Sequence, residues 1–278
     1  MEKILLAVNA INLKKNALDF ACYLARLTKS RLTGVFLENE IAAMAPVLGN
    51  VHGMLYDGQN DEEDCTYEDK MKLINANISD FEEGCIQGEV PFNITCHRGF
   101  PSNDLLKETQ FADLLVVDAD TSFNDRFEGC PTEFVHELLI KSACPVIIAP
   151  ERFNGVDELV FVYSGSISSL FAIKQFTYLF PQLFNKKVTV VQVSQSGKWD
   201  HHDKDKLMGW LSEHYYSVNF EYLFQETNAA LISLLTAKKN IFIILSSYEK
   251  FGIVQYAKNS PTDLLIKTVM KPIFITSL

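Results

Sequence analysis

Short apolar runs alternate with amphipathic stretches along the whole chain. The first run, Lys3–Asn9 (KILLAVN), is apolar throughout its centre, as expected for a central strand of a parallel sheet that is buried on both faces. The stretch after it, Leu13–Lys29, repeats apolar side chains at the spacing of a helix that covers such a sheet. These side chains are Leu13, Ala17, Phe20, Ala21, Leu24 and Leu27. The opening of the chain therefore predicts a strand followed by a helix.

The same pattern predicts five strands in each half of the chain. In the first half the predicted strands are Lys3–Asn9, Arg31–Leu37, Phe92–Cys96, Asp113–Val117 and Pro145–Ala149. In the second half they are Leu159–Tyr163, Lys187–Val193, Val218–Leu223, Ile241–Leu245 and Pro272–Thr276. The predicted helices are Leu13–Lys29, Tyr67–Ile86, Pro101–Gln110, Thr132–Ser142, Ser168–Phe184, Lys204–Tyr215, Thr227–Ala237 and Pro261–Met270. The run from Glu38 to Cys65 fits neither pattern, so we expect a surface loop or lid there.

Strands that alternate with helices of this length predict an α/β fold with parallel sheets and right-handed crossovers. Five strands per half indicate two flavodoxin-like (Rossmann-like) domains, which we place at residues 1–152 and 153–278. The ends of the halves also match, because residues 130–150 read CPTEFVHELLIKSACPVIIAP and residues 260–277 read SPTDLLIKTVMKPIFITS. Both contain Pro-Thr and an acidic residue, then Leu-Leu-Ile-Lys, then a proline before an apolar strand. The chain is therefore interpreted as a tandem repeat.

Composition narrows the expected partners and compartment. The 278 residues are 47% hydrophobic and 22% charged, with a net charge of −10, so neither nucleic acid nor an anionic membrane is expected as a partner. No apolar run approaches the ~18 residues of a membrane-spanning helix, and the N-terminal run is too short for a signal peptide. We therefore expect a cytoplasmic protein whose six cysteines, all in the first half, are free thiols.

At these residues the chain resembles the universal stress protein family in its tandem form. The similarity covers nearly all of both halves and is carried by the strand KILLAVN, the apolar strand Leu114–Val117 and the closing segment Ala143–Ile148. It implies two five-stranded parallel sheets that pair through their last strands, so that one chain forms an intrachain pseudo-dimer. Here these strands are Pro145–Ala149 and Pro272–Thr276, and pairing would cover two apolar edges. A further homodimer of whole chains stays open.

The resemblance also implies where a nucleotide would bind. Many members of the family bind ATP through a loop after the fourth strand with the pattern Gly-x-x-Gly-x(9)-Gly-Ser/Thr, because glycine lets backbone N–H groups approach phosphate closely. In the first half the matching positions are Asp118, Thr121, Pro131 and Thr132. In the second half they are Ser246, Glu249, Asn259 and Ser260. The spacing is retained, and every glycine is replaced.

These replacements disfavour ATP as a cofactor. Asp118 and Asp120 place carboxylates where the phosphates would lie, and like charges at ~4 Å cost about 1 kcal/mol in water and several times more in a partly buried site. Pro131 has no backbone N–H to donate. The acidic residue that ends the first strand in nucleotide-binding members is replaced by Asn9 in one half and by Ser164 in the other. A cation that bridges the two aspartates to phosphate is the route by which ATP could still bind.

Other groups with possible ligand chemistry have simpler explanations. Cys96-His97 could contribute to a zinc site, but no standard spacing accompanies it, so packing of Cys96 in the core is the preferred interpretation. His201-His202-Asp203 could hold a metal or could be a solvated helix start. Asp118-Ala119-Asp120 could bind a cation but lacks the spacing of an EF-hand loop. Ser164-Gly165-Ser166 is compatible with a phosphate-binding turn and equally with a helix-capping turn.

Two functions remain open after this comparison. No Ser/His/Asp order, nucleophile elbow or P-loop supports an enzyme, and no residue is assigned a catalytic role. The favoured function is a non-catalytic stress-response or regulatory binding module with degenerate ATP sites, acting through a protein partner or an unidentified small ligand. The alternative is a weak or metal-assisted ATP-binding or ATP-hydrolysing protein, supported by the spacing and by the hydroxyls of Thr132 and Ser260. Any remaining ligand site is expected beside Asn9, Phe36 and Asp118.

Overall fold

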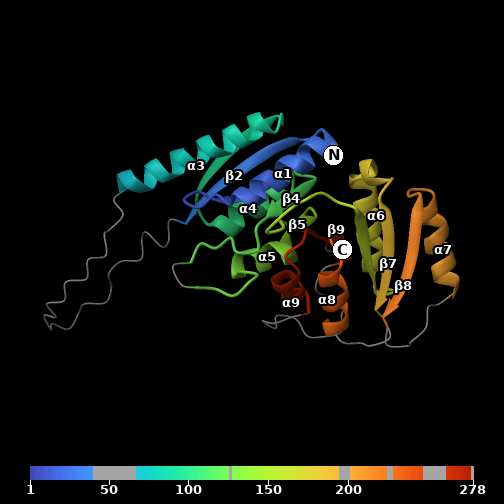
Figure 1. Ribbon diagram of the computed structural model, residues 1–278. Coiled ribbons are helices and arrows are strands. Elements are labelled where there is room, and N and C mark those ends of the chain that lie inside the picture. The colour runs from blue at the N-terminus through green and yellow to red at the C-terminus, as the bar shows by residue number, and fades with distance from the viewer. Residues whose placement is uncertain (40–66, 125–126, 194–200, 224–227, 247–260, 277–278) are drawn as a thin grey trace, which may run out of the picture.

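The strands of the protein form one continuous sheet. The computed structural model describes residues 1–39, 67–124, 127–193, 201–223, 228–246 and 261–276. Within these residues ten strands make a single sheet with helices on both faces (Figure 1). The predicted loop or lid lies outside the described residues except at Glu38 and Asn39, which extend the second strand. The α/β fold predicted from the alternating pattern is therefore confirmed.

All ten predicted strands are present, with bounds that differ by only a few residues. The first half contains β1 (Lys3–Asn9), α1 (Lys15–Thr28), β2 (Arg31–Asn39), α3 (Tyr67–Gln87), β3 (Phe92–Gly99), α4 (Pro101–Thr109), β4 (Leu114–Val117), α5 (Glu133–Lys141) and β5 (Val146–Ile148). The second half contains β6 (Glu158–Tyr163), α6 (Ile167–Leu179), η1 (Pro181–Leu183), β7 (Lys187–Val193), α7 (His201–Ser212), β8 (Ser217–Leu223), α8 (Asn228–Ala237), β9 (Ile241–Ser246), α9 (Pro261–Val269) and β10 (Ile273–Thr276). The domain boundary predicted at residues 152 and 153 falls in the connection between β5 and β6.

The two halves share one strand order. The full order is β3-β2-β1-β4-β5-β10-β9-β6-β7-β8, so each half, counted within itself, has the order 3-2-1-4-5. This is the order of the Rossmann fold, whereas a flavodoxin sheet begins 2-1-3. Of the two related names used for the predicted fold, Rossmann-like is therefore the one that describes the topology.

The halves join through their last strands, as the resemblance implied. β10 pairs antiparallel with β5, with Ile147 opposite Phe274 and Ile148 opposite Ile273. The neighbouring pairs β4–β5 and β9–β10 are parallel. The side chains of Ile147, Phe274 and Ile273 are all fully buried. The predicted intrachain pseudo-dimer is therefore confirmed, and the outer edges of the described sheet are β3 and β8.

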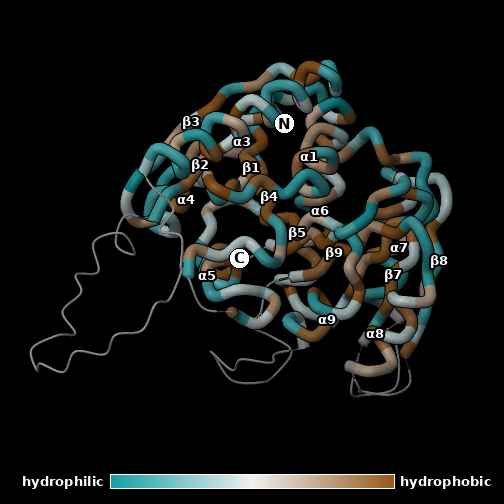
Figure 2. Tube along the Cα trace, turned by 60° about the vertical axis from the view of Figure 1, so that its left-hand side comes forward, coloured by the Kyte–Doolittle hydropathy of each residue, from teal (hydrophilic) through white to brown (hydrophobic). Residues whose placement is uncertain are grey.

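Each face of the sheet has its own hydrophobic layer. One face is covered by α1, α3, α6 and α7, and its core includes Phe20, Phe81 and Phe176. The other face is covered by α4, α5, α8 and α9, with Val135 and Leu235 in its core. In Figure 2 hydrophobic positions follow central strands such as β9, while much of the outer surface is hydrophilic. Among the described helices, none is long and apolar enough to cross a membrane.

The first helix of the second half is shorter than predicted. The pattern predicted a helix from Ser168 to Phe184, but α6 ends at Leu179 and a short 3-10 turn follows. The reason is Pro181, which has no N–H to continue the helix and whose ring clashes with the preceding turn. Ser166 caps the start, because its Oγ accepts from the Ser169 N–H at 3.1 Å. The helix therefore begins at residue 167.

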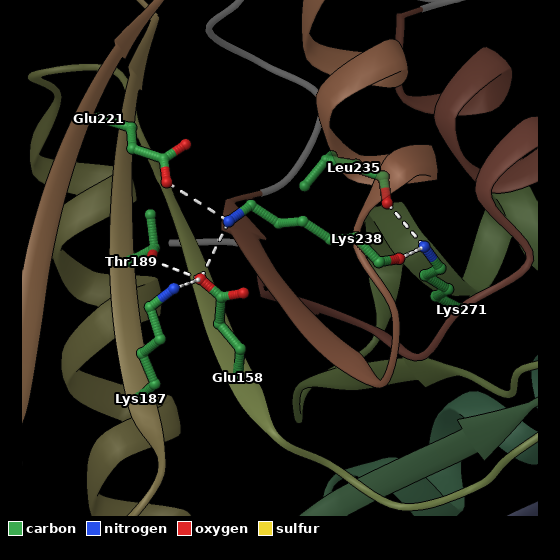
Figure 3. A network of polar contacts seen from close by, with 7 residues as sticks. All are labelled: Glu158, Lys187, Thr189, Glu221, Leu235, Lys238 and Lys271. Atoms are coloured by element: carbon green, nitrogen blue, oxygen red, sulfur yellow. Dashed lines mark hydrogen bonds and ion pairs between the residues drawn. The ribbon is translucent and has the colours of Figure 1, made fainter.

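A polar network joins the amino ends of three strands in the second half (Figure 3). The Glu158 carboxylate lies 3.0 Å from Lys238 Nζ and 3.3 Å from Lys187 Nζ, and it accepts from the Thr189 hydroxyl at 2.5 Å. Lys238 also pairs with Glu221 at 3.4 Å. Burial alone would raise the pKa of Glu158, but the hydrogen bonds from Thr189 and Lys238, together with the Lys238 charge, lower it below its ordinary value. The network therefore favours the charged carboxylate.

Lys271 completes the end of α8 beside this network (Figure 3). Its ammonium group donates to the Leu235 carbonyl at 2.7 Å and to the Thr236 carbonyl at 3.1 Å, and it also contacts the Lys238 carbonyl. The last carbonyls of a helix have no partner within the helix and need one from elsewhere. A cation at this end also interacts favourably with the helix dipole. Lys271, which precedes β10, thus ties the end of α8 to the strand that joins the two halves.

Replacing Glu158 with glutamine should destabilise the protein in a pH-dependent way. At pH 7 we expect the free energy of unfolding to fall by roughly 1–2 kcal/mol, because a charge-assisted hydrogen-bond acceptor is lost. Since the native pKa of Glu158 is lowered, the stabilisation is present above the unfolded value of ~4.3 and is lost as the pH falls through the native value. Urea unfolding of both proteins between pH 3 and 7 measures this. Glu151→Gln on the surface is the control, and a difference that does not change with pH would contradict the assignment.

Candidate functional site

The strand order places one candidate site at the carboxyl ends of β1 and β4. In open α/β sheets ligands bind where the strand order reverses direction, and in the first half this point lies between β1 and β4. Asn9 is the last residue of β1, and Asp118 directly follows β4. The loop after β4 then leads to α5. The structure therefore brings Asn9, Asp118, Thr121 and Thr132 to one region, as the sequence predicted.

The side chain of Asn9 is held by the protein itself. Its Nδ2 donates to the Ser122 carbonyl at 2.8 Å, and its Oδ1 accepts from the Ile11 N–H at 3.1 Å. Both ends of the amide are therefore engaged, one with the loop after β4 and the other with the turn after β1. An asparagine at this position ties the two loops together across the point where a nucleotide would enter.

Asp118 is also satisfied by groups of the chain. Its Oδ2 accepts from Asn16 Nδ2 at 2.9 Å, and its Oδ1 accepts from the Asp120 N–H at 3.0 Å. Asn16 lies on α1 and donates in addition to the Pro150 carbonyl at 3.1 Å. The carboxylate therefore links α1, the loop after β4 and the segment after β5. Each oxygen of Asp118 already has a donor, as a buried or half-buried carboxylate requires.

The hydroxyl at the start of α5 closes the loop. Thr132 is buried; its Oγ1 donates to the Thr121 carbonyl at 2.5 Å and accepts from the Val135 N–H at 3.3 Å. The Thr121 N–H in turn donates to the Asp118 carbonyl at 3.1 Å, and the Thr132 N–H donates to the Ala119 carbonyl at 3.2 Å. Thr132 thus caps the helix. At this helix start the Thr132 N–H, the Thr132 hydroxyl and the Val135 N–H are therefore bonded to the protein.

The rest of the loop is crosslinked by a carboxylate. Ser122 Oγ donates to Glu128 Oε2 at 2.5 Å, and Asn124 Nδ2 donates to Glu128 Oε1 at 2.6 Å. Beside it lies a cavity of about 390 Å³ whose lining includes Glu128, Glu133 and Glu137. Lys141 hydrogen bonds to Glu137 and lowers the pKa of that carboxyl. This cavity is therefore lined by groups of the same charge sign as a phosphate.

Charges of the same loop contribute to the pKa of the Cys130 thiol. Burial, together with the nearby carboxylates of Asp120 and Asp118, raises its pKa to about 12, while Lys267 on α9 opposes this shift. A thiolate and a phosphate carry the same sign of charge. The field that disfavours an anion at Cys130 therefore disfavours one in the loop as well.

Two sequence-based expectations about neighbouring residues are not met. Phe36 is 1% exposed and packs edge-on against Phe81 at 5.7 Å between ring centroids, so its ring lies in the core and away from the loop. Cys96 is exposed, and the prediction that it packs in the core was wrong. The reason is that β3 is an edge strand of the sheet, which leaves one side of it uncovered. Its position at the edge could not be recognised from the alternating pattern alone.

The second half has a different arrangement at its own reversal point. Ser164 follows β6, and its Oγ lies 2.9 Å from Ser166 Oγ and 3.3 Å from Ser169 Oγ. Gly165 has φ +80°, a conformation that glycine adopts readily. Because Ser166 caps α6, the helix-capping explanation of this turn is confirmed. Ser246 ends the adjacent strand β9, is 7% exposed and lies opposite Thr276 of β10.

The remaining candidates can be placed only in part. Ser260, Glu249 and Asn259 lie outside the described residues. α7 begins at His201, and the side chains of His201 and His202 are not among the described positions. Among the side chains that are described, no group of three histidine, cysteine, aspartate or glutamate residues could hold a metal ion.

Comparison with known structures identifies the fold over the full chain. A universal stress protein from Archaeoglobus fulgidus DSM 4304 is similar with a TM-score of 0.68 at 14% identity, covering 99% of this chain and 98% of that one. A functionally unknown protein from Pseudomonas aeruginosa PAO1 is similar with a TM-score of 0.59 at 13% identity, covering 100% of this chain and 92% of its own. No protein-family model and no curated protein matches the sequence. The chain therefore has the full-length fold of a universal stress protein.

Replacing Thr132 with valine should test whether its hydroxyl serves the fold. The variant loses both the helix cap and the bond to Thr121. We therefore expect its free energy of unfolding to be roughly 1–2 kcal/mol lower than that of the wild type. Thr132→Ser keeps the hydroxyl and is the matched control, with a smaller loss. Chemical unfolding followed by circular dichroism measures both variants. Equal losses in valine and serine would show that the methyl group, and not the hydroxyl, matters at this position.

Proposed function

We propose that the protein is a tandem universal stress protein that acts as a non-catalytic regulatory binding module with degenerate ATP sites. The observation that carries this proposal is the set of internal hydrogen bonds at the first-half site. Asn9, Asp118 and Thr132 each use their polar atoms on other parts of the chain. A nucleotide that used these polar atoms would have to break their internal bonds, each at a cost of about 1 kcal/mol or more.

The charges of the site support the same proposal. Phosphate binding at a helix start needs backbone N–H donors and a positive potential. Here the loop presents the carboxylates of Asp118, Asp120 and Glu128, and the Thr132 N–H is used by the Ala119 carbonyl. Repulsion of a triphosphate by these groups adds to the cost of opening the loop. The retained spacing of the loop is then explained by its role in capping α5.

The proposal includes expectations for partners and location. The module would act through a protein partner or a small ligand other than ATP, with no role for nucleic acid or a membrane, since the net charge is −10. We place it in the cytoplasm, where reduced thiols are the resting state of the described cysteines, which are all free. The full-length fold likeness to a universal stress protein supports the family assignment on which the proposal rests.

Calorimetric titration with ATP tests the proposal. For the wild type we expect no binding in the micromolar range, either without metal or with magnesium or manganese, and no phosphate release above the buffer rate. The protein should also release no nucleotide when it is denatured and examined by mass spectrometry. Micromolar affinity in any of these conditions, or a co-purifying nucleotide, would overturn the degenerate-site proposal and favour the ATP-binding alternative.

A charge-neutral variant separates the two reasons for the absence of binding. Asp120→Asn removes one carboxylate and keeps the size of the side chain. It leaves the hydrogen bonds of Asn9, Asp118 and Thr132 in place, because Asp120 takes part in them only through its backbone N–H. If repulsion dominates, this variant should bind ATP measurably while the wild type does not. If the internal hydrogen bonds dominate, neither protein should bind. A thermal unfolding scan of the variant without ligand confirms that it is folded before the titration.

A further inference from the structure

Two cysteines face each other in the core between α1 and α3. Cys22 on α1 and Cys85 on α3 are separated by 63 positions in the sequence, and their sulfur atoms lie 4.0 Å apart in a hydrogen bond. Cys85 is 0% exposed and Cys22 is 6% exposed. The disulfide bond length is ~2.0 Å, so the two sulfur atoms are within about 2 Å of bonding distance. No other function of the protein described above uses this pair.

Two glycines allow the helices to approach closely enough to bring the thiols together. A Cβ atom at Gly84 would lie 2.8 Å from Leu18 Cδ2, which is too close for a side chain to fit without a shift. A Cβ atom at Gly88 would lie 3.4 Å from Cys22 Cβ and 3.2 Å from the Gly84 carbonyl. Cys22 Sγ also lies 3.8 Å from that carbonyl. The close contact between α1 and the end of α3 therefore positions the cysteine pair.

One of the two cysteines borders a surface groove. Cys22 is part of the lining of a groove of about 450 Å³ along α1 and α3, whose charged residues are Lys15, Arg26, Asp19, Asp80 and Glu83. The hydrogen bond from Cys85 lowers the pKa of Cys22, with a smaller contribution from Arg26, against the opposing effects of burial and Asp19. The same hydrogen bond and burial raise the pKa of Cys85. Cys22 is therefore the stronger nucleophile of the pair, since the thiolate is the reactive form.

We infer that Cys22 and Cys85 form an oxidation site that reacts with a small hydroperoxide to give a disulfide. The Cys22 thiolate attacks one oxygen of hydrogen peroxide, the O–O bond breaks, and Cys22 becomes a sulfenic acid while hydroxide leaves and takes up a proton to form water. The Cys85 thiol then attacks the Cys22 sulfur, the S–O bond breaks, and a second water leaves. The two thiols supply the two electrons that reduce the peroxide, and a dithiol reductant reverses the change.

The disulfide would change how α3 is attached to the protein. Only three of the 21 residues in α3 are buried, namely Ile74, Phe81 and Cys85. A covalent bond from Cys85 to α1 would fix the carboxyl end of α3 to the first helix of the domain. It would also restrict the unfolded chain by closing a long loop, and this stabilises the folded state. The oxidised protein should therefore melt at a higher temperature than the reduced one.

Peptide mapping after peroxide treatment tests the inference on the full chain. Cys96→Ser is used as the background, because Cys96 is exposed and would share the tryptic peptide that carries Cys85. The reduced protein is exposed to hydrogen peroxide, and free thiols are then alkylated. We expect a peptide pair joined through Cys22 and Cys85 that disappears with dithiothreitol. It should form at least ~10-fold faster than Cys144 is oxidised, because burial raises the pKa of that thiol to about 11.

Single variants and thermal scans provide independent readouts. In Cys85→Ser, Cys22 should be trapped as a sulfenic acid by dimedone, whereas in Cys22→Ser the remaining Cys85 should stay unlabelled. The melting temperature should rise on oxidation in the Cys96→Ser background and not in either variant. The inference is overturned if Cys22 remains reduced at peroxide concentrations that oxidise Cys144, if it proceeds to a sulfinic acid without crosslinking, or if the crosslink joins other cysteines. Labelling of Cys85 in place of Cys22 would overturn the assigned order of attack.

Discussion

The antiparallel pairing of β5 with β10 is the interaction on which the rest of the structure depends. Without it each half would end in a short apolar strand with unpaired backbone groups, an arrangement that favours aggregation. With it, Ile147 and Phe274 are buried opposite each other and two five-stranded sheets become one. The pairing also brings α9 of the second half close enough for the Lys267 charge to act on Cys130 in the first. Each half therefore forms part of the environment of the other.

The two halves share a fold but differ in sequence. The points where their strand orders reverse therefore carry different polar side chains. The first-half reversal point is closed by hydrogen bonds from Asn9, Asp118 and Thr132. The second-half point carries a cluster of serine hydroxyls around Ser164 and Ser166. The polar groups of a buried loop need hydrogen-bond partners, since each buried polar group must be satisfied. In the first half those partners come from within the chain.

Helices α1 and α3 approach each other closely, and this contact is the second feature of the first half that depends on the presence or absence of glycine. There, positions 84 and 88 are glycine, and the helices pack closely enough to set Cys22 beside Cys85. The loop after β4 has Asp118, Thr121 and Pro131 where the resemblance implies glycines, whereas this helix contact depends on glycine. At the helix contact the absence of a side chain lets the two thiols meet, whereas in the loop the side chains of Asp118 and Thr132 make the internal hydrogen bonds. The loop after β4 and the Cys22–Cys85 pair are separate features of the first half and share no residues.

The sequence by itself determined the strands, their alternation with helices and the tandem repeat, because apolar periodicity such as that of Lys3–Asn9 is a local property. The expectation that the loop after β4 disfavours phosphate also comes from local residue types, those of Asp118 and Pro131. Only the tertiary structure decided which groups satisfy Asn9 and Asp118, that Phe36 lies in the core, and that Cys96 lies on an exposed edge. The meeting of Cys22 and Cys85 was decided there as well, because it depends on how two helices pack across 63 positions of sequence.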